Sequence, residues 1–573
     1  MNLSVPAAPA RGWQLDLSLP IFVVLALLLC GLVLLPLGWL GYYAFTDKDG
    51  GFTFGNFLRV FTDPSFIGPF LTTFWISLAV ALGSVTVAAP LAWLVARTDM
   101  PLRRTIRVLV TASFVTPPFL GAIAWEILAA PTAGMLNQLY QSLLGLGPYD
   151  NLFNIYTAAG LAFVMACYAF PYVFVLLANA IERIPGDLED ASAILGGGSW
   201  HTLRRIVLPM VLPSMLAGAL IAFLQAMTQF GAPAILALPS GFHVITTKIW
   251  SLFQYPSNPQ LAAAAALPLL LLTVALLQLQ RRLLGRRQYT VVGGKSGAAR
   301  RIALGRGRWV ALAFAAAVLA LTVLLPYAAL LKASFLRTAS DPLIWSKLTL
   351  YNYHWIFFEF PESRRAFFNT FTIGFAAATG GAILALAVAS LAARRTFPGA
   401  RALATLATAP VAIPGIVLGV GLFLSYTRPP FVLYGTPWIL LLAFVTIELP
   451  AAYQQIEAAL LGLHPELEEA SRIFGATRLR ALASITAPLI ATSVVATWCF
   501  IFIGAIRELS ATIMLTTAKT KLVSVLIYDL NESGDLGLIA VLGLTLLVIT
   551  FAVVAFANRV VPALRQGGPR QAG

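Results

Sequence analysis

The stretch Leu188-Glu-Asp-Ala-Ser-Ala-Ile-Leu-Gly196 occurs a second time as Leu467-Glu-Glu-Ala-Ser-Arg-Ile-Phe-Gly475. The two copies lie 279 positions apart, and the same offset relates Ile206-Val-Leu-Pro209 to Ile485-Thr-Ala-Pro488 without a gap. Self-similarity at a fixed offset is the sequence signature of a repeated structural unit. The repetition therefore predicts a chain made of two related halves.

A second register relates the regions that precede these stretches. Thr73 matches Thr370 and Pro101 matches Pro398, with an offset of 297 positions. The larger offset indicates a deletion of 18 residues in the second half, where loop 427–433 is much shorter than loop 131–152. We therefore expect a parallel duplication. The first half is expected over 1–290 and the second over 291–573.

The composition places both halves in a membrane. Hydrophobic residues make up 59% of the 573 residues and charged residues 11%, whereas soluble proteins have about 45–50% and about 25%. Twelve apolar runs are long enough to cross a bilayer as helices, which satisfy their backbone groups without water. The sequence thus predicts an all-α polytopic membrane protein of about 12 transmembrane helices, six in each parallel-repeat half. The runs cover about 19–45, 71–96, 106–130, 153–180, 207–237, 260–280, 308–333, 367–393, 403–426, 434–460, 485–515 and 535–560.

The net charge of +15 does not indicate a nucleic-acid partner, because the basic residues lie in short loops between the apolar runs. With the N-terminus inside, the inner segments hold 26 of the 38 Lys and Arg residues. This bias predicts a multi-pass protein with both termini in the cytoplasm. Nine basic residues fall between Arg281 and Arg308, which indicates a cytoplasmic linker that joins the halves and contacts anionic membrane lipid.

Each repeated stretch is expected to form a short helix, a glycine break and a second helix, over 187–209 and 466–488. Apolar residues recur at positions i, i+3 and i+7, which gives a narrow apolar stripe, and small residues beside it allow another surface to approach closely. Gly196 and Gly475 can take the left-handed conformation that ends a helix. Such a helix outside the membrane is predicted to dock a partner. The candidate docking residues are Asp190, Ala191, Ser192, Gly196, Glu469, Ala470, Ser471 and Gly475.

This doubled pattern resembles the Glu-Ala-Ala loop of the membrane subunits of bacterial ABC importers. Asp190 replaces the glutamate of the first copy, Ser192 and Ser471 replace the second alanine, and Ala487 replaces a leucine in the Ile-x-Leu-Pro that follows. The resemblance implies a type I ABC importer permease fold in a bacterial inner (plasma) membrane. It also implies two copies of a cytoplasmic ABC ATPase, which bind ATP and Mg²⁺, and a periplasmic or extracellular substrate-binding protein.

The resemblance covers the whole chain, because fused twelve-span permeases are typical of the ferric-iron importers and of thiamine and aminoethylphosphonate or polyamine-like relatives. Phe230-Gly-Ala-Pro-Ala-Ile-Leu236 and Arg507-Glu-Leu-Ser-Ala-Thr512 are most similar to the ferric-iron transport system permeases. Ferric iron is therefore the expected substrate, with the other solutes as alternatives. A secondary transporter with parallel repeats is the alternative class, although it gives no reason for two matching docking helices.

No catalytic, cofactor or metal site is expected within this chain. Gly294-Lys-Ser296 is similar to the end of a phosphate-binding loop, but Tyr289 stands where the first glycine belongs. The four histidines are not paired at metal-ligand spacing. We therefore expect a transport subunit that is not an enzyme and relies on its partner for ATP hydrolysis.

A few polar side chains interrupt the apolar runs. Charges in lipid are costly, so Arg507, Glu508, Glu126 and Glu448 are expected to face the bundle interior. Gln229 is the match of Glu508 in the 279-residue register. Such residues either line a substrate pathway near the symmetry axis or fix the packing of helices. The pathway candidates are Gln225, Gln229, Arg507 and Glu508.

Overall fold

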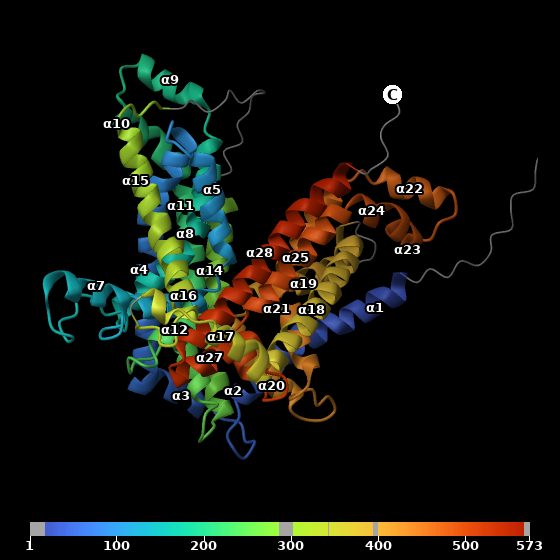
Figure 1. The fold of residues 1–573 in the computed structure, drawn as a ribbon. Coiled ribbons are helices and arrows are strands. Elements are labelled where there is room, and N and C mark those ends of the chain that lie inside the picture. Colours follow the sequence, from blue (N-terminus) through green and yellow to red (C-terminus); the bar gives the residue numbers. More distant parts are fainter. Residues whose placement is uncertain (1–17, 286–301, 342, 394–398, 567–573) are drawn as a thin grey trace, which may run out of the picture.

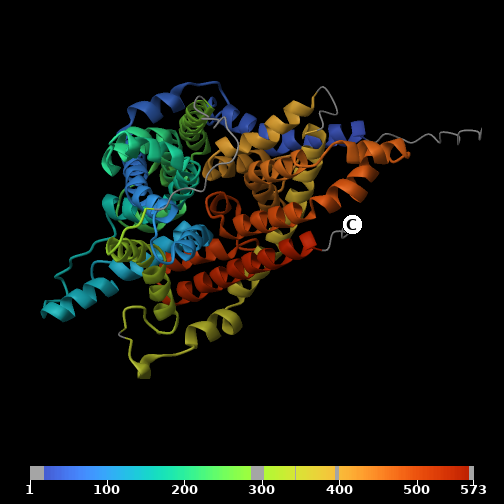
Figure 2. The ribbon, with the colours of Figure 1, turned by 90° about the horizontal axis from the view of Figure 1, so that it is seen from above.

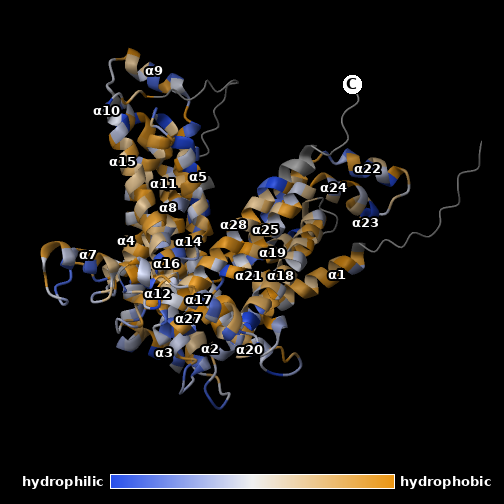
Figure 3. Ribbon diagram, viewed as in Figure 1, coloured by the Kyte–Doolittle hydropathy of each residue, from blue (hydrophilic) through white to orange (hydrophobic). Residues whose placement is uncertain are grey.

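The structure is a computed structural model that describes residues 18–285, 302–341, 343–393 and 399–566. Helices make up about four fifths of this described part, which contains no strand and only three isolated backbone bridges (Figure 1). Hydrophobic residues cover the helices along most of their length (Figure 3). Many large apolar side chains are exposed there, such as Leu271 at 66% and Val310 at 73%, as a lipid environment favours. The predicted all-α membrane fold is confirmed.

Among the described residues, nine helices are long and apolar enough to cross a membrane, and the number rises to twelve if each of three bent helix pairs is one span. Six of the nine are continuous α-helices, and three contain a π-helical turn. The continuous helices are α4 (Pro64–Arg97), α8 (Ala158–Glu182), α14 (Pro259–Gly285), α18 (Pro361–Ala393), α21 (Pro437–Leu461) and α28 (Leu536–Gln566).

The three spans with a π turn owe it to proline. In each of them the π turn ends two residues before a proline: Pro36, Pro209 or Pro326. Proline lacks an N–H and its ring clashes with the carbonyl four residues earlier, so the backbone widens locally and the helix continues. These spans are α1 (Ser18–Leu29), η1 (Cys30–Leu34) and α2 (Leu35–Ala44); α10 (Ser199–Thr202), η3 (Leu203–Val207) and α11 (Leu208–Thr228); and α15 (Gly307–Leu319), η4 (Ala320–Leu324) and α16 (Leu325–Ser334).

Three of the expected spans, over about 106–130, 403–426 and 485–515, are sharply bent, which the apolar runs did not indicate. The bends measure 101°, 113° and 81°. Thr116 and Ile413 each precede a proline and adopt an extended conformation, as that position favours. The bent pairs are α5 (Arg103–Ala112) with η2 (Ser113–Val115) and α6 (Pro118–Ala129); α19 (Ala400–Thr408) with η7 (Ala409–Ala412) and α20 (Gly415–Tyr426); and α23 (Arg478–Ala481), η8 (Leu482–Thr486) and α24 (Ala487–Leu489) with α25 (Ala491–Arg507).

The fifth and eleventh spans end earlier than expected, and both end in the same way. α11 stops at Thr228 and α25 at Arg507, and the next residues, Gln229 and Glu508, are extended. Two short helices follow in each half. They are α12 (Gly231–Leu236) and α13 (Ile245–Ser251) in the first half, and α26 (Thr512–Leu515) and α27 (Val523–Ser533) in the second.

The duplication is visible in hydrogen bonds as well as in helices. The hydroxyl of Thr73 in α4 accepts a bond of 2.8 Å from the N–H of Ile245. Its match in the second half, Thr370 in α18, accepts one of 3.0 Å from the N–H of Val523. Each bond attaches the start of a short helix, α13 in the first half and α27 in the second, to the second span of the same half.

The first span of each half lies against the other half. α1 and α2 contact α19 and α20, while α15 and α16 contact α5 and α6 (Figures 1 and 2). The hydroxyl of Tyr426 at the end of α20 donates to the carbonyl of Gly31, at 3.0 Å. The hydroxyls of Thr116 and Tyr327 lie 2.5 Å apart. The halves are therefore joined by exchanged helices.

The two halves meet at one end of the molecule and diverge toward the other (Figure 1). α2, α20 and α27 gather at the joined end. α9 (Gly186–Ile194) and α22 (Glu466–Ile473), which carry the repeated stretch, lie at the diverging end, one on each arm.

Candidate functional site

Both copies of the repeated stretch form a short helix that ends at a glycine with positive φ. The glycines are Gly196 (φ +81°) after α9 and Gly475 (φ +92°) after α22. The next N–H, that of Gly197, donates to the carbonyl of Ser192 at 2.8 Å, and the second copy makes the same bond. Residues with a Cβ rarely adopt a positive φ, so the turn itself requires glycine here.

The predicted docking residues do not all face outward. Ser192 is only 7% exposed, and its hydroxyl lies 2.8 Å from that of Thr202. It therefore fastens α9 to α10 and does not contribute to an exposed surface. Of the other candidates, Ala191, Gly196, Glu469, Ala470 and Gly475 are exposed, and Asp190 and Ser471 are half-buried.

We call α9 and α22 the motif helices, because they carry the repeated stretch. At the end of each motif helix, a pair of large apolar residues is almost fully exposed. The exposed fractions are 85% for Ile194, 88% for Leu195, 84% for Ile473 and 92% for Phe474. The pairs match each other in the 279-residue register. Exposed apolar residues that gather at one place mark interaction surfaces. The apolar stripe expected from the sequence includes Leu195 and Phe474 but not Ile194 and Ile473.

Three of the four predicted pathway residues line one small cavity of about 60 Å³ between the halves. Gln225 and Gln229 come from α11 and its end, and Arg507 comes from the end of α25. Arg507 also donates from Nη1 to the carbonyl of Phe114, at 2.5 Å, in the bent third span. The other polar lining residues are Ser113, Thr116, Tyr168 and Tyr172.

Glu508 does not line this cavity. Its carboxylate accepts hydrogen bonds of 3.1–3.3 Å from the N–H groups of Ser510, Ala511 and Thr512, and from the Thr512 hydroxyl. A carboxylate that accepts several N–H groups at the start of a helix satisfies donors that have no helical partner. Glu508 therefore caps the turn into α26.

A larger cavity, of about 640 Å³, lies between the halves near the joined end. Glu126 lines it from the end of α6, and its Oε1 accepts a 2.7 Å bond from the Tyr156 hydroxyl. Arg337 of the second half also lines it and lies 4.7 Å from the centre of the Tyr351 ring. The sequence did not indicate Arg337 or Tyr351, because only the packing of the halves brings them beside Glu126.

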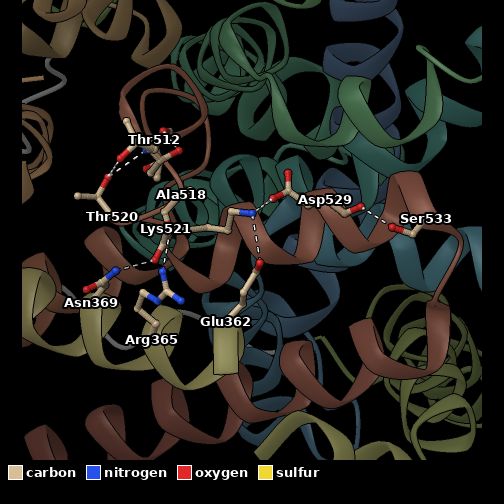
Figure 4. A network of polar contacts seen from close by, with 11 residues as sticks. Glu362, Arg365, Asn369, Thr512, Ala518, Thr520, Lys521, Asp529 and Ser533 are labelled. Carbon is tan, nitrogen blue, oxygen red and sulfur yellow. Dashed lines mark hydrogen bonds and ion pairs between the residues drawn. The ribbon is translucent and has the colours of Figure 1, made fainter. Parts of the chain in front are cut away.

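A polar network fastens the segment before α27 to the start of α18 (Figure 4). Nζ of Lys521 lies 2.7 Å from Asp529 and 3.5 Å from Glu362. Asn369 donates from its side chain to the carbonyls of Lys519 and Lys521. Burial lowers the pKa of Lys521, but the interactions with Asp529 and then Glu362 outweigh it, so this pKa lies above its ordinary value. The amine is therefore charged in the network.

Within the described part of the chain, no three His, Cys, Asp or Glu side chains gather as metal ligands would. Gly294-Lys-Ser296, which is similar to the end of a phosphate-binding loop, lies outside the described residues, as does most of the basic linker. The candidate sites are therefore the two motif helices and the cavities between the halves.

Comparison with known proteins defines the class. Two stretches of the chain, 88–289 and 385–566, match the model of the binding-protein-dependent transport system inner membrane component. Each stretch contains one motif helix and the spans that hold it. The chain belongs to this family of inner-membrane transport components, and it contains the family's unit twice.

Named relatives align with most of this chain or with about half of it. The chain is 27% identical over 463 residues to the ferric transport system permease protein FbpB of Actinobacillus pleuropneumoniae, which covers 78% of this chain and 64% of that protein. It is 26% identical to the sulfate transport system permease protein CysT of Escherichia coli, over 46% of this chain and 91% of that protein. The chain thus aligns with less than two thirds of the length of the first of these relatives.

A crystal structure of a bacterial ABC transporter involved in alginate import is also similar. Its matching chain is 18% identical, with a TM-score of 0.38, and the alignment covers 46% of this chain and 95% of that one.

Proposed function

We propose that this chain is the membrane-spanning permease of a binding-protein-dependent ABC importer, and that α9 and α22 each dock one cytoplasmic ATPase subunit. The observation that carries the proposal is the twofold occurrence of a short helix, a positive-φ glycine and an exposed apolar pair at one end of the molecule. Family membership and two equivalent docking helices support two equivalent partners. In this proposal both termini lie on the cytoplasmic side, as the charge bias predicts.

The two arms give docking a mechanical consequence. α9 belongs to the arm of α4, α8 and α11, and α22 belongs to the arm of α18, α21 and α25. A dimer of ATPase subunits that closes around ATP would draw α9 and α22 together and rock the arms about the joined end. The bound ATP and Mg²⁺ belong to the partner, and this chain supplies the docking surfaces and the pathway. Gln225, Gln229 and Arg507 are the proposed pathway residues.

The docking proposal is tested by co-purification of the chain with its ATPase subunit. We expect Leu195→Ser together with Phe474→Ser to reduce the retained ATPase by about ten-fold or more, because buried apolar anchors dominate such interfaces. Leu143→Ser changes another highly exposed leucine, at 74% in α7 (Met135–Leu144), and is expected to leave retention unchanged. Full retention by the double variant would contradict docking at these helices.

We further propose ferric iron as the transported solute, supplied by a binding protein on the outer side. The support is that relatives named as ferric transport permeases align over most of this chain. Sulfate, thiamine and aminoethylphosphonate or polyamine-like solutes are the competing candidates, and sulfate is favoured by its own set of named relatives.

Uptake by cells that express the full importer decides between these solutes. We expect uptake of radioactive iron to depend on the chain, and uptake of radioactive sulfate not to depend on it. The opposite result would assign sulfate. Dependence of neither uptake would reject both candidates and direct the test to thiamine and aminoethylphosphonate.

A further inference from the structure

Arg97 is the largest of the fully buried side chains among the described residues, with 1% of its surface exposed, and it ends α4 beside the first motif helix. Its Nη2 donates to the carbonyl of Ile184 at 2.8 Å, in the turn between α8 and α9. The same Nη2 lies 3.4 Å from Oε1 of Glu189, in the first turn of α9. One guanidinium thus connects α4 to the base of α9 and to α9 itself.

The backbone at Arg97 also holds the chain where it enters the second half. The N–H of Ile302 donates to the carbonyl of Arg97 at 2.7 Å, and the N–H of Asp99 donates to the carbonyl of Ile302 at 3.2 Å. The Asp99 carboxylate then accepts a 2.9 Å bond from the N–H of Leu304. α15 begins three residues later, at Gly307, and packs on α4 and α5. The end of α4 is therefore attached both to α9 and to the exchanged span.

The guanidinium is only partly satisfied in this conformation. Nε and Nη1 of Arg97 are buried without a hydrogen-bond partner, so Nη2 makes both of the side chain's polar contacts. An arginine used only for stability is expected to spread its bonds over its five N–H groups, often bidentately with a carboxylate. Because Glu189 contacts only Nη2, Nε and Nη1 can donate hydrogen bonds to α9 when α9 is displaced.

The second half holds its motif helix with a different set of contacts. Glu468, the match of Glu189, accepts a 2.8 Å bond from the hydroxyl of Thr486 in η8. The residue that matches Thr486 in the first half is Val207, which has no hydroxyl. In the 297-residue register the match of Arg97 is Arg394, which lies outside the described residues. α9 is attached to its own next span through Ser192 and Thr202 instead, and Glu189, which has no matching hydroxyl to bond, lies beside Arg97 of α4.

We propose that Arg97 is a positioning residue for coupling: it holds α9 against the end of α4 and against segment 302–304, so that a displacement of α9 is passed to the exchanged span α15. The inference rests on the proposed docking of an ATPase at α9. In this proposal, the contacts of Arg97 with α9 transfer the movement of the docking helix to both halves.

The first test measures position without any partner. Spin labels are placed at Ala193 in α9 and Trp309 in α15, both exposed, in the full chain without its native cysteines and in lipid nanodiscs. We expect one narrow distance distribution for the parent protein and a clearly broader one for Arg97→Gln. The matched control is Arg107→Gln. This change removes the ion pair between α5 and Glu182 of α8, which lies on the same arm but does not include a residue of α9. An unchanged distribution in Arg97→Gln would overturn the proposal.

The second test measures coupling in the complex with the ATPase subunit, reconstituted with the binding protein. We expect Glu189→Gln to keep ATPase binding within about two-fold while uptake per ATP hydrolysed falls by about five-fold or more. The exchanged pair Arg97→Glu with Glu189→Arg is expected to recover part of the loss of Arg97→Glu alone, as paired charges do in a double-mutant cycle. Normal coupling in Glu189→Gln would refute the role of the pair.

The two proposals fail in distinguishable ways. If the parent chain retains no ATPase subunit, the proposed function fails, whereas the spin-label test of α9 against α15 still stands. If the parent chain couples normally and Arg97→Gln or Glu189→Gln does too, only the positioning role fails. Should Arg97→Gln not reach the membrane, Glu189→Gln keeps the bond from Arg97 to Ile184 and is used in both tests.

Discussion

At the residue scale, Gly421 sets how closely the exchanged first span approaches the second half. A Cβ at this position of α20 would lie 2.9 Å from the carbonyl oxygen of Pro36 in α2 and 3.1 Å from the Cβ of the same proline. These atoms belong to the backbone or are bonded to it, so they cannot move aside without shifting α2. Gly421→Ala is expected to lower the free energy of unfolding by about 1–3 kcal/mol, as overpacking does.

The measurement for Gly421→Ala is the temperature at which half of the purified protein in detergent loses its fold. Gly380→Ala in α18 is the matched control, because no atom lies within 4 Å of its added Cβ. Alanine favours a helix by about 1 kcal/mol over glycine, so the control is expected to hold or raise the midpoint. Equal midpoints for both variants would contradict the close approach of α20 and α2.

Arg507 and Glu508 are neighbours in sequence but have different surroundings. Arg507 lines the cavity between the halves, whereas Glu508 caps α26. Glu508→Ala is expected to cost about 1–2 kcal/mol of stability because it removes a capping carboxylate, and Glu508→Gln less, since its amide oxygen still accepts. Arg507→Ala is expected to reduce uptake by more than either Glu508 variant does, at equal membrane levels.

The check on this pair measures thermal stability and uptake per folded molecule for each variant. Glu508→Ala with normal stability and abolished uptake would reverse the assignment and return Glu508 to the pathway. The sequence could not separate the two residues, because a polar pair at the end of an apolar run looks the same whether its side chains face a cavity or the following N–H groups.

At the scale of the element, the turn after α9 requires glycine at Gly196 but not at Gly198, two residues later. Gly196 has φ +81°, whereas Gly198 has an ordinary φ and open space around an added Cβ. Gly196→Ala is expected to cost about 1–2 kcal/mol in the turn, the strain of a left-handed residue, and to reduce retained ATPase subunit by several-fold. Gly198→Ala is expected to leave retention unchanged, and an equal loss in both variants would show that the turn geometry does not matter.

The helices were predictable from the sequence as apolar runs, but their bends were not. Pro90 in α4, Pro171 in α8 and Pro450 in α21 lie inside continuous helices. Pro414 instead lies at a bend of 113°. The same residue type gives both outcomes, because neighbouring helices decide whether the freed carbonyl is re-satisfied or the chain turns. The hydropathy of the sequence shows the apolar run but not whether the helix bends at its proline.

At the scale of the whole molecule, the 279- and 297-residue registers predicted two related units but not that their first spans are exchanged. An exchanged and an unexchanged first span bury the same apolar residues, so the apolar pattern is identical in both. The contacts that reveal the exchange are specific and local. They are the bond from Tyr426 to Gly31 and the pair of Thr116 with Tyr327.

These contacts hold the two halves together at the joined end, and the diverging arms carry the motif helices (Figure 1). The arms can therefore pivot about the joined end. A ligand shifts such an arrangement only if it binds one state better than the other, and an ATPase dimer that holds both α9 and α22 favours the state in which they are close. We therefore expect spin labels at Arg183 and Leu461, exposed residues beside α9 and α22 that are not among the docking candidates, to move closer when the ATPase subunits and non-hydrolysable ATP are added. Labels at Leu143 and Trp345, away from the motif helices, serve as the control and are expected to change little. An unchanged distance between α9 and α22 in a complex that retains its ATPase would contradict rocking of the arms and leave docking without movement.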